Sequence, residues 1–261
     1  MTRSKIGLII AASLIVIVGP IAYVILFGFQ TMMAVEARYI AHKSRDAWQT
    51  PVPLPDTSVS STAHKQVSYF GYELELPWDD VDPNRVKAFG TVHVTYFLSG
   101  NVFWFSTFGP KNFINEVMKT DKMDADTFRG TYGNSTQSDY DFYRTMLEVT
   151  PDSIGPLMSQ QDDSRNSALL VLKAIAMPNS ESGIFDIRSG DLRGFQFNGA
   201  RGKRTLIVDD LYGDDGGVEI WFGQEPKKSA PAITQPEINR VLKSIHKISA
   251  PPPTSDPKPR P

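Results

Sequence analysis

The chain has 261 residues, with 27 Lys and Arg against 29 Asp and Glu, and a formal net charge of -2. Its 41% hydrophobic and 21% charged residues are typical of a globular protein, and the near-neutral charge gives no basic field that would attract nucleic acid. The absence of cysteine excludes disulfides, thiolate nucleophiles and cysteine-based zinc or iron–sulfur sites.

The longest apolar segment covers residues 6–29 and contains no charged residue. As a helix it would measure roughly 36 Å, which is enough to cross a hydrocarbon core about 30 Å thick. It is longer than the apolar region of a cleavable signal peptide, the alternative, for which Val35-Glu36-Ala37 would be the cleavage site. We therefore predict a basic cytoplasmic N-terminus over residues 1–5 and a single transmembrane anchor over residues 6–29, with the membrane as a partner.

The orientation of this anchor is not decided by the flanking charges. Arg3 and Lys5 lie on one side, and Arg38, Lys43 and Arg45 lie on the other. A short basic N-terminus stays in the cytoplasm easily, and long domains are translocated largely regardless of charge. We expect the large domain on the outer face of the membrane, which in a bacterium is the periplasmic side of the inner membrane. A cytoplasmic domain is the alternative.

Residues 30–67 are predicted to form a helical extension, from Gln30 to Trp48, followed by a spacer rich in Pro and Ser. Residues 68–249 give enough chain for one globular domain with a sizeable core. Its first strand is predicted at Tyr72–Leu76, where apolar residues alternate with two glutamates.

Two β-rich runs follow, Lys87–Leu98 and Val102–Phe108, and the short connection between them predicts an antiparallel hairpin. Helical spacing then indicates three helices. They begin after Pro110, at Ser138 and near Asp162, and the third is expected to end at Met177.

A period of two returns over residues 183–224, where three turns rich in Gly, Asn and Asp predict a four-stranded meander. Thr234 and Glu237 then form a capping box. The helix that follows is expected to pack one apolar face on the sheet: Ile238, Val241, Leu242, Ile245 and Ile248. The order of elements predicts an α+β domain with a predominantly antiparallel sheet of about six to seven strands, flanked by helices.

The opening segment Gly71–Trp78, the hairpin after it and the closing amphipathic helix together resemble the PsbP/Mog-type α/β/α sandwich, named after an extrinsic photosystem subunit. The resemblance covers residues 68–249 and is one of element order. It implies a binding or assembly role and transfers no catalytic residue. The anchor and the C-terminal segment have no counterpart in that fold.

Residues 250–261 contain six prolines and no apolar anchor, which predicts a disordered, extended tail. The functional alternative is a Pro-rich ligand for an aromatic groove.

An acidic segment between the last two meander strands offers oxygen ligands for Ca²⁺, although its spacing does not match an EF-hand and a hairpin turn explains the same residues. The candidates are Asp209, Asp210, Asp214, Asp215 and Glu219.

No two of the four histidines have ligand spacing, so a histidine metal site is not expected. They are His42, His64, His93 and His246.

Residues 199–204 contain glycine and basic residues but lack the glycine spacing and the Ser or Thr of a phosphate-binding loop. A basic hairpin tip that contacts lipid headgroups or an anionic partner is the preferred interpretation. Trp221 falls on the same strand face as Glu219 and is a further contact candidate. The predicted partner contacts are Trp221, Arg201, Lys203 and Arg204.

No sequence motif of a serine hydrolase occurs, and Asp79, Asp80 and Asp82 are as well explained by a solvated turn as by a sugar cleft. We predict no catalytic residue and no cofactor. The predicted function is a membrane-anchored, non-catalytic binding or assembly domain, with an unknown protein partner and no nucleic acid. The alternatives are an anchored enzyme of hydrolase type and a divalent-cation-binding domain.

Overall fold

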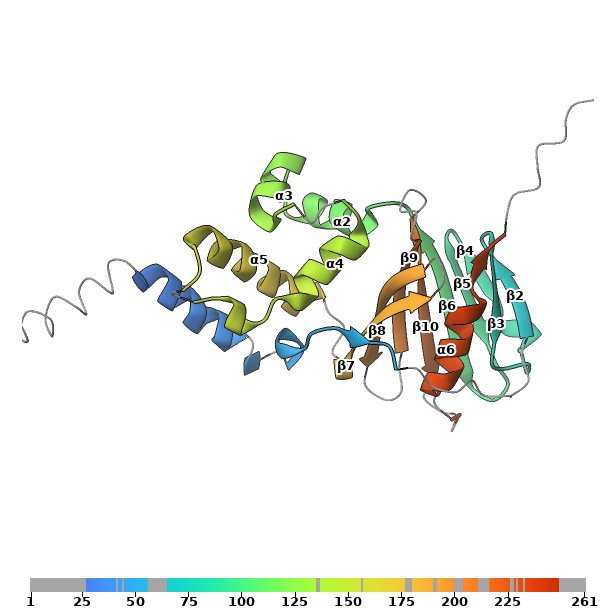
Figure 1. Ribbon diagram of the computed structural model, residues 1–261. Helices are drawn as coiled ribbons and strands as arrows, with labels where there is room; N and C mark the ends of the chain where they lie inside the picture. The colour runs from blue at the N-terminus through green and yellow to red at the C-terminus, as the bar shows by residue number, and fades with distance from the viewer. Residues whose placement is uncertain are drawn as a thin grey trace, which may run out of the picture. The chain divides into compact units, whose positions relative to one another are not determined.

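A computed structural model of the protein contains two compact units (Figure 1). The helical unit comprises residues 1–51 and 113–183, and the sheet unit comprises residues 52–112 and 184–261. Residues 68–249, predicted as one domain, therefore contribute to both. The structure describes residues 27–40, 42–43, 45–55, 65–134, 137–155, 157–176, 180–189, 192–199, 204–210, 216–225, 228, 230–231 and 233–248.

Most of the predicted anchor, residues 6–26, lies outside the described residues, as does the predicted tail, residues 250–261. Within the described ranges, no helix combines the length and apolar character needed to cross a bilayer. The anchor over residues 6–29 stays a prediction.

The helical unit opens with an N-terminal helical segment, residues 27–40 and 42–43, which overlaps the helical extension predicted from Gln30 to Trp48. The remaining elements are η1 (Arg45–Trp48), α2 (Asn112–Thr120), α3 (Ala125–Tyr132), α4 (Asp139–Glu148), η3 (Pro151–Ser153) and α5 (Gln160–Ala176). Three of these helices were predicted. α3 was not, although Asp124 caps it by accepting a hydrogen bond from the Thr127 amide at 2.7 Å.

The core of the helical unit is an aromatic cluster. Phe142 of α4 contacts the rings of Phe113, Phe128 and Tyr132, at centroid distances of 5.1 to 5.7 Å. Asp139, at the start of α4, is buried, and its two carboxylate oxygens accept from the amides of Phe113 and Ile114 at 3.0 Å. One carboxylate therefore satisfies the first turn of α2 and joins two helices.

Lys173 of α5 is completely buried, which is rare for a lysine. Its ammonium lies 2.7 to 2.8 Å from the carbonyl oxygens of Gln49, Leu147 and Val149, and 3.4 Å from that of Ala47. Three of these contacts match the three protons that an ammonium can donate. The cation therefore ties the end of η1 and the end of α4 to α5.

The sheet unit contains an eight-stranded sheet in the order β1-β7-β8-β9-β10-β6-β5-β4 and a three-stranded sheet in the order β11-β3-β2. β1 pairs with β7 in parallel, and β8–β9, β9–β10, β10–β6, β6–β5 and β5–β4 are antiparallel. The strands are β1 (Val52–Pro53), β2 (Lys65–Tyr69), β3 (Tyr72–Leu76), β4 (Lys87–Phe89), β5 (Val92–Tyr96), β6 (Asn101–Phe108), β7 (Ser180–Ser189), β8 (Leu192–Gly199), β9 (Arg204–Asp210), β10 (Gly217–Gln224) and β11 (His246–Lys247). A short turn, η2 (Pro83–Arg85), precedes β4.

The α+β class and the largely antiparallel pairing confirm the prediction, whereas the expected six to seven strands are too few. Phe70 and Gly71, with φ of 49° and 83°, form a tight turn that makes β2 and β3 a hairpin, so residues 65–67 belong to a strand rather than to the spacer. Gly90, with φ of 57°, likewise divides the predicted run Lys87–Leu98 into β4 and β5.

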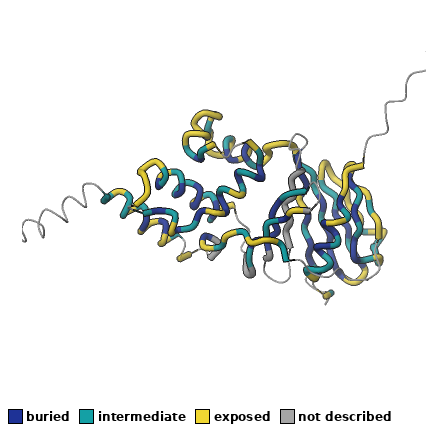
Figure 2. Tube along the Cα trace, in the orientation of Figure 1, coloured by how far each residue is buried: buried dark blue, intermediate teal, exposed yellow. Residues whose placement is uncertain are grey.

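The core of the sheet unit lies between the inner face of the large sheet, the small sheet and the helix α6 (Gln235–Ser244) (Figure 2). Phe103 and Phe105 of β6 and Phe222 of β10 are fully buried there, against Leu74 and Leu76 of β3. The predicted hairpin, the four-stranded meander β7–β10 and the capping box of Thr234 and Glu237 are confirmed. The last helix is shorter than expected. It ends at Ser244, and Ile248 lies beyond it and is exposed.

We expect Lys173→Met to destabilise the helical unit by about 3 kcal/mol, because several buried carbonyls would lose their donor. Thermal unfolding followed by the helical circular dichroism signal measures this loss. Lys119→Met is the matched control, since Lys119 is exposed and pairs with Glu116 at 3.7 Å, and should change stability by less than about 0.5 kcal/mol. Equal stability of both variants would contradict a structural role for the buried cation.

The pH dependence of stability should carry opposite contributions from two histidines. Burial lowers the pKa of His93 below its ordinary 6.5, so the unfolded state binds the proton more readily and stability falls as the pH falls through 6.5. The Ser244 carbonyl and the Glu73 carboxylate raise the pKa of His246, so its contribution is present below 6.5 and is lost as the pH rises through the higher folded pKa.

Urea midpoints from about pH 8 to about pH 5 test this in His93→Gln and His246→Gln variants. On acidification, the stability advantage of the parent over His93→Gln should shrink, and its advantage over His246→Gln should grow. Parallel pH profiles for all three proteins would contradict the assignment.

Candidate groove on the outer face of the sheet

The outer face of the large sheet carries aromatic residues that the core does not use. Along β6, Phe103 and Phe105 point into the core. The residues that alternate with them, Val102 and Trp104, therefore lie on the opposite face. In β10, Phe222 is buried on the inner face, so the same alternation places its neighbour Trp221 on the outer face. Two tryptophans are thereby displayed on the solvent side of two central strands.

The strand register brings these residues into one row. Lys87 of β4 lies opposite Val94 of β5, Val94 lies opposite Trp104, and Trp104 lies opposite Trp221. Phe89, 54% exposed, reaches the Trp104 ring edge-on at a centroid distance of 6.3 Å. The row crosses four adjacent strands.

The Trp221 ring lies over the backbone of its own strand at Gly223, two residues further on. A Cβ atom at Gly223 would overlap the indole, and the Gly223 backbone is outside the left-handed region. The glycine is therefore required by the neighbouring ring and not by its own conformation. Val94 and Val102, both nearly fully buried, form the floor beside it.

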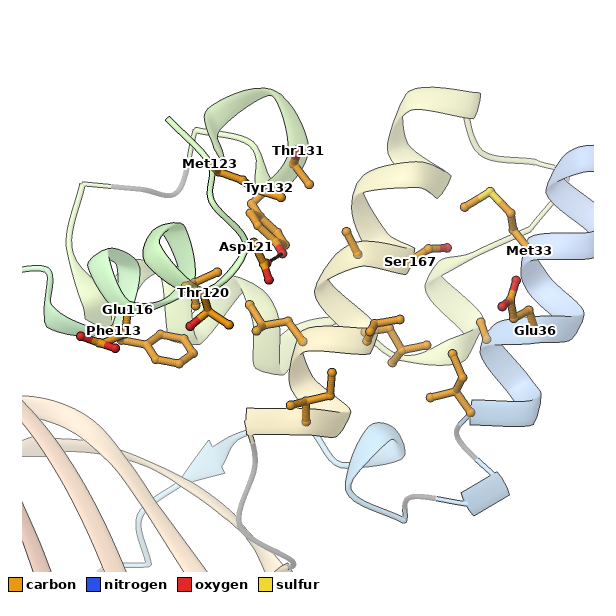
Figure 3. A pocket seen from close by; sticks show the side chains of 18 residues that line it. Met33, Glu36, Phe113, Glu116, Thr120, Asp121, Met123, Thr131, Tyr132 and Ser167 are labelled. Atoms are coloured by element: carbon orange, nitrogen blue, oxygen red, sulfur yellow. Dashed lines mark hydrogen bonds between the residues drawn. The ribbon is translucent and has the colours of Figure 1, made fainter. Parts of the chain in front are cut away.

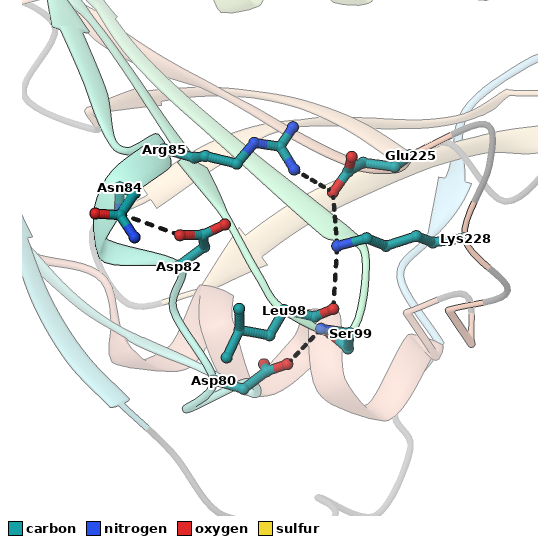
Figure 4. A network of polar contacts seen from close by, with 8 residues as sticks. All are labelled: Asp80, Asp82, Asn84, Arg85, Leu98, Ser99, Glu225 and Lys228. Carbon is teal, nitrogen blue, oxygen red and sulfur yellow. Dashed lines mark hydrogen bonds and ion pairs between the residues drawn. The ribbon is translucent and has the colours of Figure 1, made fainter.

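A polar network, shown in Figure 4, lies beside the row, near the C-terminal ends of β5 and β10. The Arg85 guanidinium lies over the Tyr96 ring, 4.1 Å from its centroid, and donates to Glu225 at 2.8 Å. Lys228 pairs with the same carboxylate at 3.4 Å and donates to the Leu98 carbonyl at 3.1 Å. The hydrogen bond from Arg85, reinforced by Lys228, lowers the pKa of Glu225, so this carboxylate stays ionised.

These side chains enclose the Trp221 groove, an open groove of about 850 Å³ within the range of ligand sites. Three cations and one carboxylate give the described lining residues a net positive charge. The groove is lined by Arg85, Lys87, Phe89, Val94, Tyr96, Val102, Trp104, Trp221, Gln224, Glu225 and Lys228.

The described lining of the groove carries recognition chemistry. Among these residues Glu225 is the one carboxylate, it is occupied by Arg85 and Lys228, and no histidine or serine is present. A pair of acids or a nucleophile with its base is therefore absent from these lining residues.

The structure brings one predicted contact, Trp221, into this groove. Arg201 and Lys203 lie outside the described residues, and Arg204 is described only as backbone in β9.

The predicted calcium ligands are not assembled into a described site. Asp214 and Asp215 lie outside the described residues, Asp209 and Asp210 are described as β9 backbone, and Glu219 is exposed on β10. The part of the chain that the structure describes contains no cluster of His, Asp or Glu able to hold a metal.

Two of the three aspartates considered for a sugar cleft, Asp80 and Asp82, have local structural roles. Asp80 accepts from the Ser99 amide at 2.6 Å, and Asp82 caps η2 by accepting from the Asn84 amide at 3.1 Å. These contacts agree with the solvated-turn interpretation.

Sequence reasoning missed most of the groove. Trp104, Lys87 and Tyr96 belong to the predicted hairpin, and the available signal was that apolar residues occur on both faces of its strands, since Trp104 alternates with Phe103 and Phe105. Joining Trp104 to Trp221 requires the pairing of β6 with β10, which are more than 100 residues apart in the chain.

Comparison with family models, with curated proteins and with solved structures finds no match to this chain. The resemblance to the PsbP/Mog-type sandwich stays a prediction.

We expect Gly223→Ala to move the Trp221 ring out of the groove, at a stability cost of about 1 kcal/mol, because a half-buried ring can swing towards solvent. Tryptophan emission should shift to longer wavelength.

Two controls isolate this effect. Gly109→Ala should leave the spectrum unchanged, since a Cβ there meets nothing within 4 Å. Adding Gly223→Ala to Trp221→Phe should give no emission shift relative to Trp221→Phe alone. A shift that persists in that double variant would show that another tryptophan responds.

Proposed function

We propose that this protein is a membrane-anchored, non-catalytic binding module whose Trp221 groove holds a short, extended, acidic peptide segment of a partner protein. The observation that carries the proposal is the cross-strand pair of Trp104 and Trp221 on the solvent side of the sheet, bordered by basic side chains. Exposed aromatic rings and Arg are characteristic of recognition surfaces.

The size of the row supports an extended segment. Four adjacent strands at about 4.8 Å spacing span roughly 14 Å, which an extended chain covers with about four residues. Aromatic faces provide contact area for apolar or proline side chains along such a segment.

The charge of the groove supports an acidic ligand. Lys87 is exposed in the row, and Arg85 and Lys228 retain 39% and 38% side-chain exposure while they share Glu225. A carboxylate on the ligand would gain an attraction that a basic ligand would lack.

Strand addition at the nearby sheet edge is a less suitable mode. β4 is the edge strand, but it has three residues and carries Lys87, and both features discourage pairing with another chain. The side-chain groove is therefore the preferred contact surface.

The anchor proposal assigns residues 6–29 to a single transmembrane helix, with the two units on the outer face of the membrane. Its support is the uncharged length of that segment and the short basic N-terminus. The function proposed for the groove does not depend on this orientation.

The test is a peptide array probed with the full-length protein, with sequences that vary in acidic, proline and aromatic content. We expect retention of short acidic peptides with apolar or proline residues, and a loss of affinity of about tenfold or more in Trp104→Ala, which removes a central aromatic contact. Lys87→Glu should weaken the same peptides because it reverses a groove charge.

Lys119→Glu, a charge reversal in the helical unit, is the matched control and should bind like the parent. Acidic oligosaccharides serve as competitors of similar charge. The proposal would be overturned if Trp104→Ala retained the peptides as well as the parent does. It would also be overturned if the acidic oligosaccharides displaced every bound peptide.

A further inference from the structure

The helical unit contains a second pocket, distinct from the Trp221 groove (Figure 3). It has a volume of about 640 Å³ and lies among the N-terminal helical segment, α2, α3 and α5. Met33 and Ile40 approach from the first of these, Phe113 and Val117 from α2, and Leu170 from α5. The walls are predominantly apolar.

We propose that this pocket binds a single-chain lipid whose head group donates hydrogen bonds and carries no negative charge. The inference does not depend on the function proposed for the Trp221 groove.

Apolar surface at the pocket is incompletely covered by the chain itself. Ile175 and Val171, which line it from α5, are 76% and 40% exposed. Exposed apolar residues that continue into a pocket of ligand size are typical of a binding site.

The shape favours a chain rather than a helix as the occupant. An α-helix with its side chains measures about 10 to 12 Å across. A single acyl chain is thinner and flexible. Met33 and Met123 in the walls supply side chains that adapt to such a shape.

Charge selects the head group. Among the described residues, Glu36, Glu116 and Asp121 line the pocket, and no Lys, Arg or His does. Glu116 is paired with Lys119 outside the pocket at 3.7 Å, and Asp121 accepts from the Tyr132 hydroxyl at 3.4 Å. A carboxylate or phosphate head would be repelled, whereas a hydroxylated head would find acceptors.

One polar part of the pocket lies between α5 and the N-terminal helical segment. Ser167 is in the wall facing Met33 and Glu36 (Figure 3), and among the described residues its buried hydroxyl has no hydrogen-bond partner. Movement of the flexible Met33 side chain would open this hydroxyl to a ligand. Glu36, one turn beyond Met33, provides the acceptor for a lipid hydroxyl.

The location of the pocket gives a lipid a short route from the membrane. Met33 lies four residues after the end of the predicted anchor at Phe29. This route requires the proposed anchor, whereas the pocket and its charge do not.

The test uses the full-length chain held in an amphipathic polymer, so that no free single-chain detergent competes for the pocket. The probe is a monoacylglycerol with a photoreactive diazirine in its acyl chain. After illumination, mass spectrometry should locate the label on the peptides that contain Met33, residues 113–123 and residues 167–175.

Ala168→Phe fills the pocket and should reduce this labelling about tenfold. Ala176→Phe makes the same change at an exposed position at the end of the same helix, outside the pocket, and should leave labelling unchanged. Unfolding temperatures of both variants establish that each is folded. Labelling confined to residues 6–29, or equal labelling of two folded variants, would overturn the proposal.

Competition tests the charge argument separately. Unlabelled monoolein should displace the probe at a concentration about tenfold lower than oleate, which has the same chain and a negative head. Glu36→Gln should reduce the difference between the monoolein and oleate concentrations needed to displace the probe. Equal competition by monoolein and oleate in the parent protein would contradict the selection of an uncharged head.

Discussion

The pairing of β6 with β10 is the constraint on which the sheet unit depends. The two strands are in register over eight residue pairs, from Gly217 opposite Phe108 to Gln224 opposite Asn101. Because side chains alternate between faces, this register fixes two surfaces at once. Phe103, Phe105 and Phe222 form the core on one side, and Trp104 and Trp221 form the groove on the other. A slip of one residue would exchange the two surfaces.

The helical unit depends on a different kind of constraint, which is polar. Buried Asp139 satisfies the start of α2, and buried Lys173 satisfies carbonyls at the ends of η1 and α4. Unlike apolar contacts, these bonds specify particular partners, since an unsatisfied buried group is costly. They hold α2 and α5, two of the helices that line the pocket, against α4.

Local patterns predicted much of the fold because they act over a few residues. The Ser138 cap, the Thr234 and Glu237 capping box and the alternation in Tyr72–Leu76 depend on near neighbours, and the structure confirms each. The turn at Phe70 and Gly71 was missed because Phe at positive φ gives no turn signal. The groove could be predicted only through Trp221, since its other aromatic residues meet Trp221 through long-range strand pairing.

The discontinuity of the helical unit has a consequence for synthesis on the ribosome. Residues up to 51 belong to this unit, yet the residues that complete it, including Lys173, follow an entire hairpin region of the sheet unit. The carbonyls of Ala47 and Gln49 therefore emerge more than 120 residues before their donor. Neither unit can close while only the first half of the chain has left the exit tunnel. Both must wait for the second half, and the helical unit, whose last residue is 183, can close before the sheet unit does.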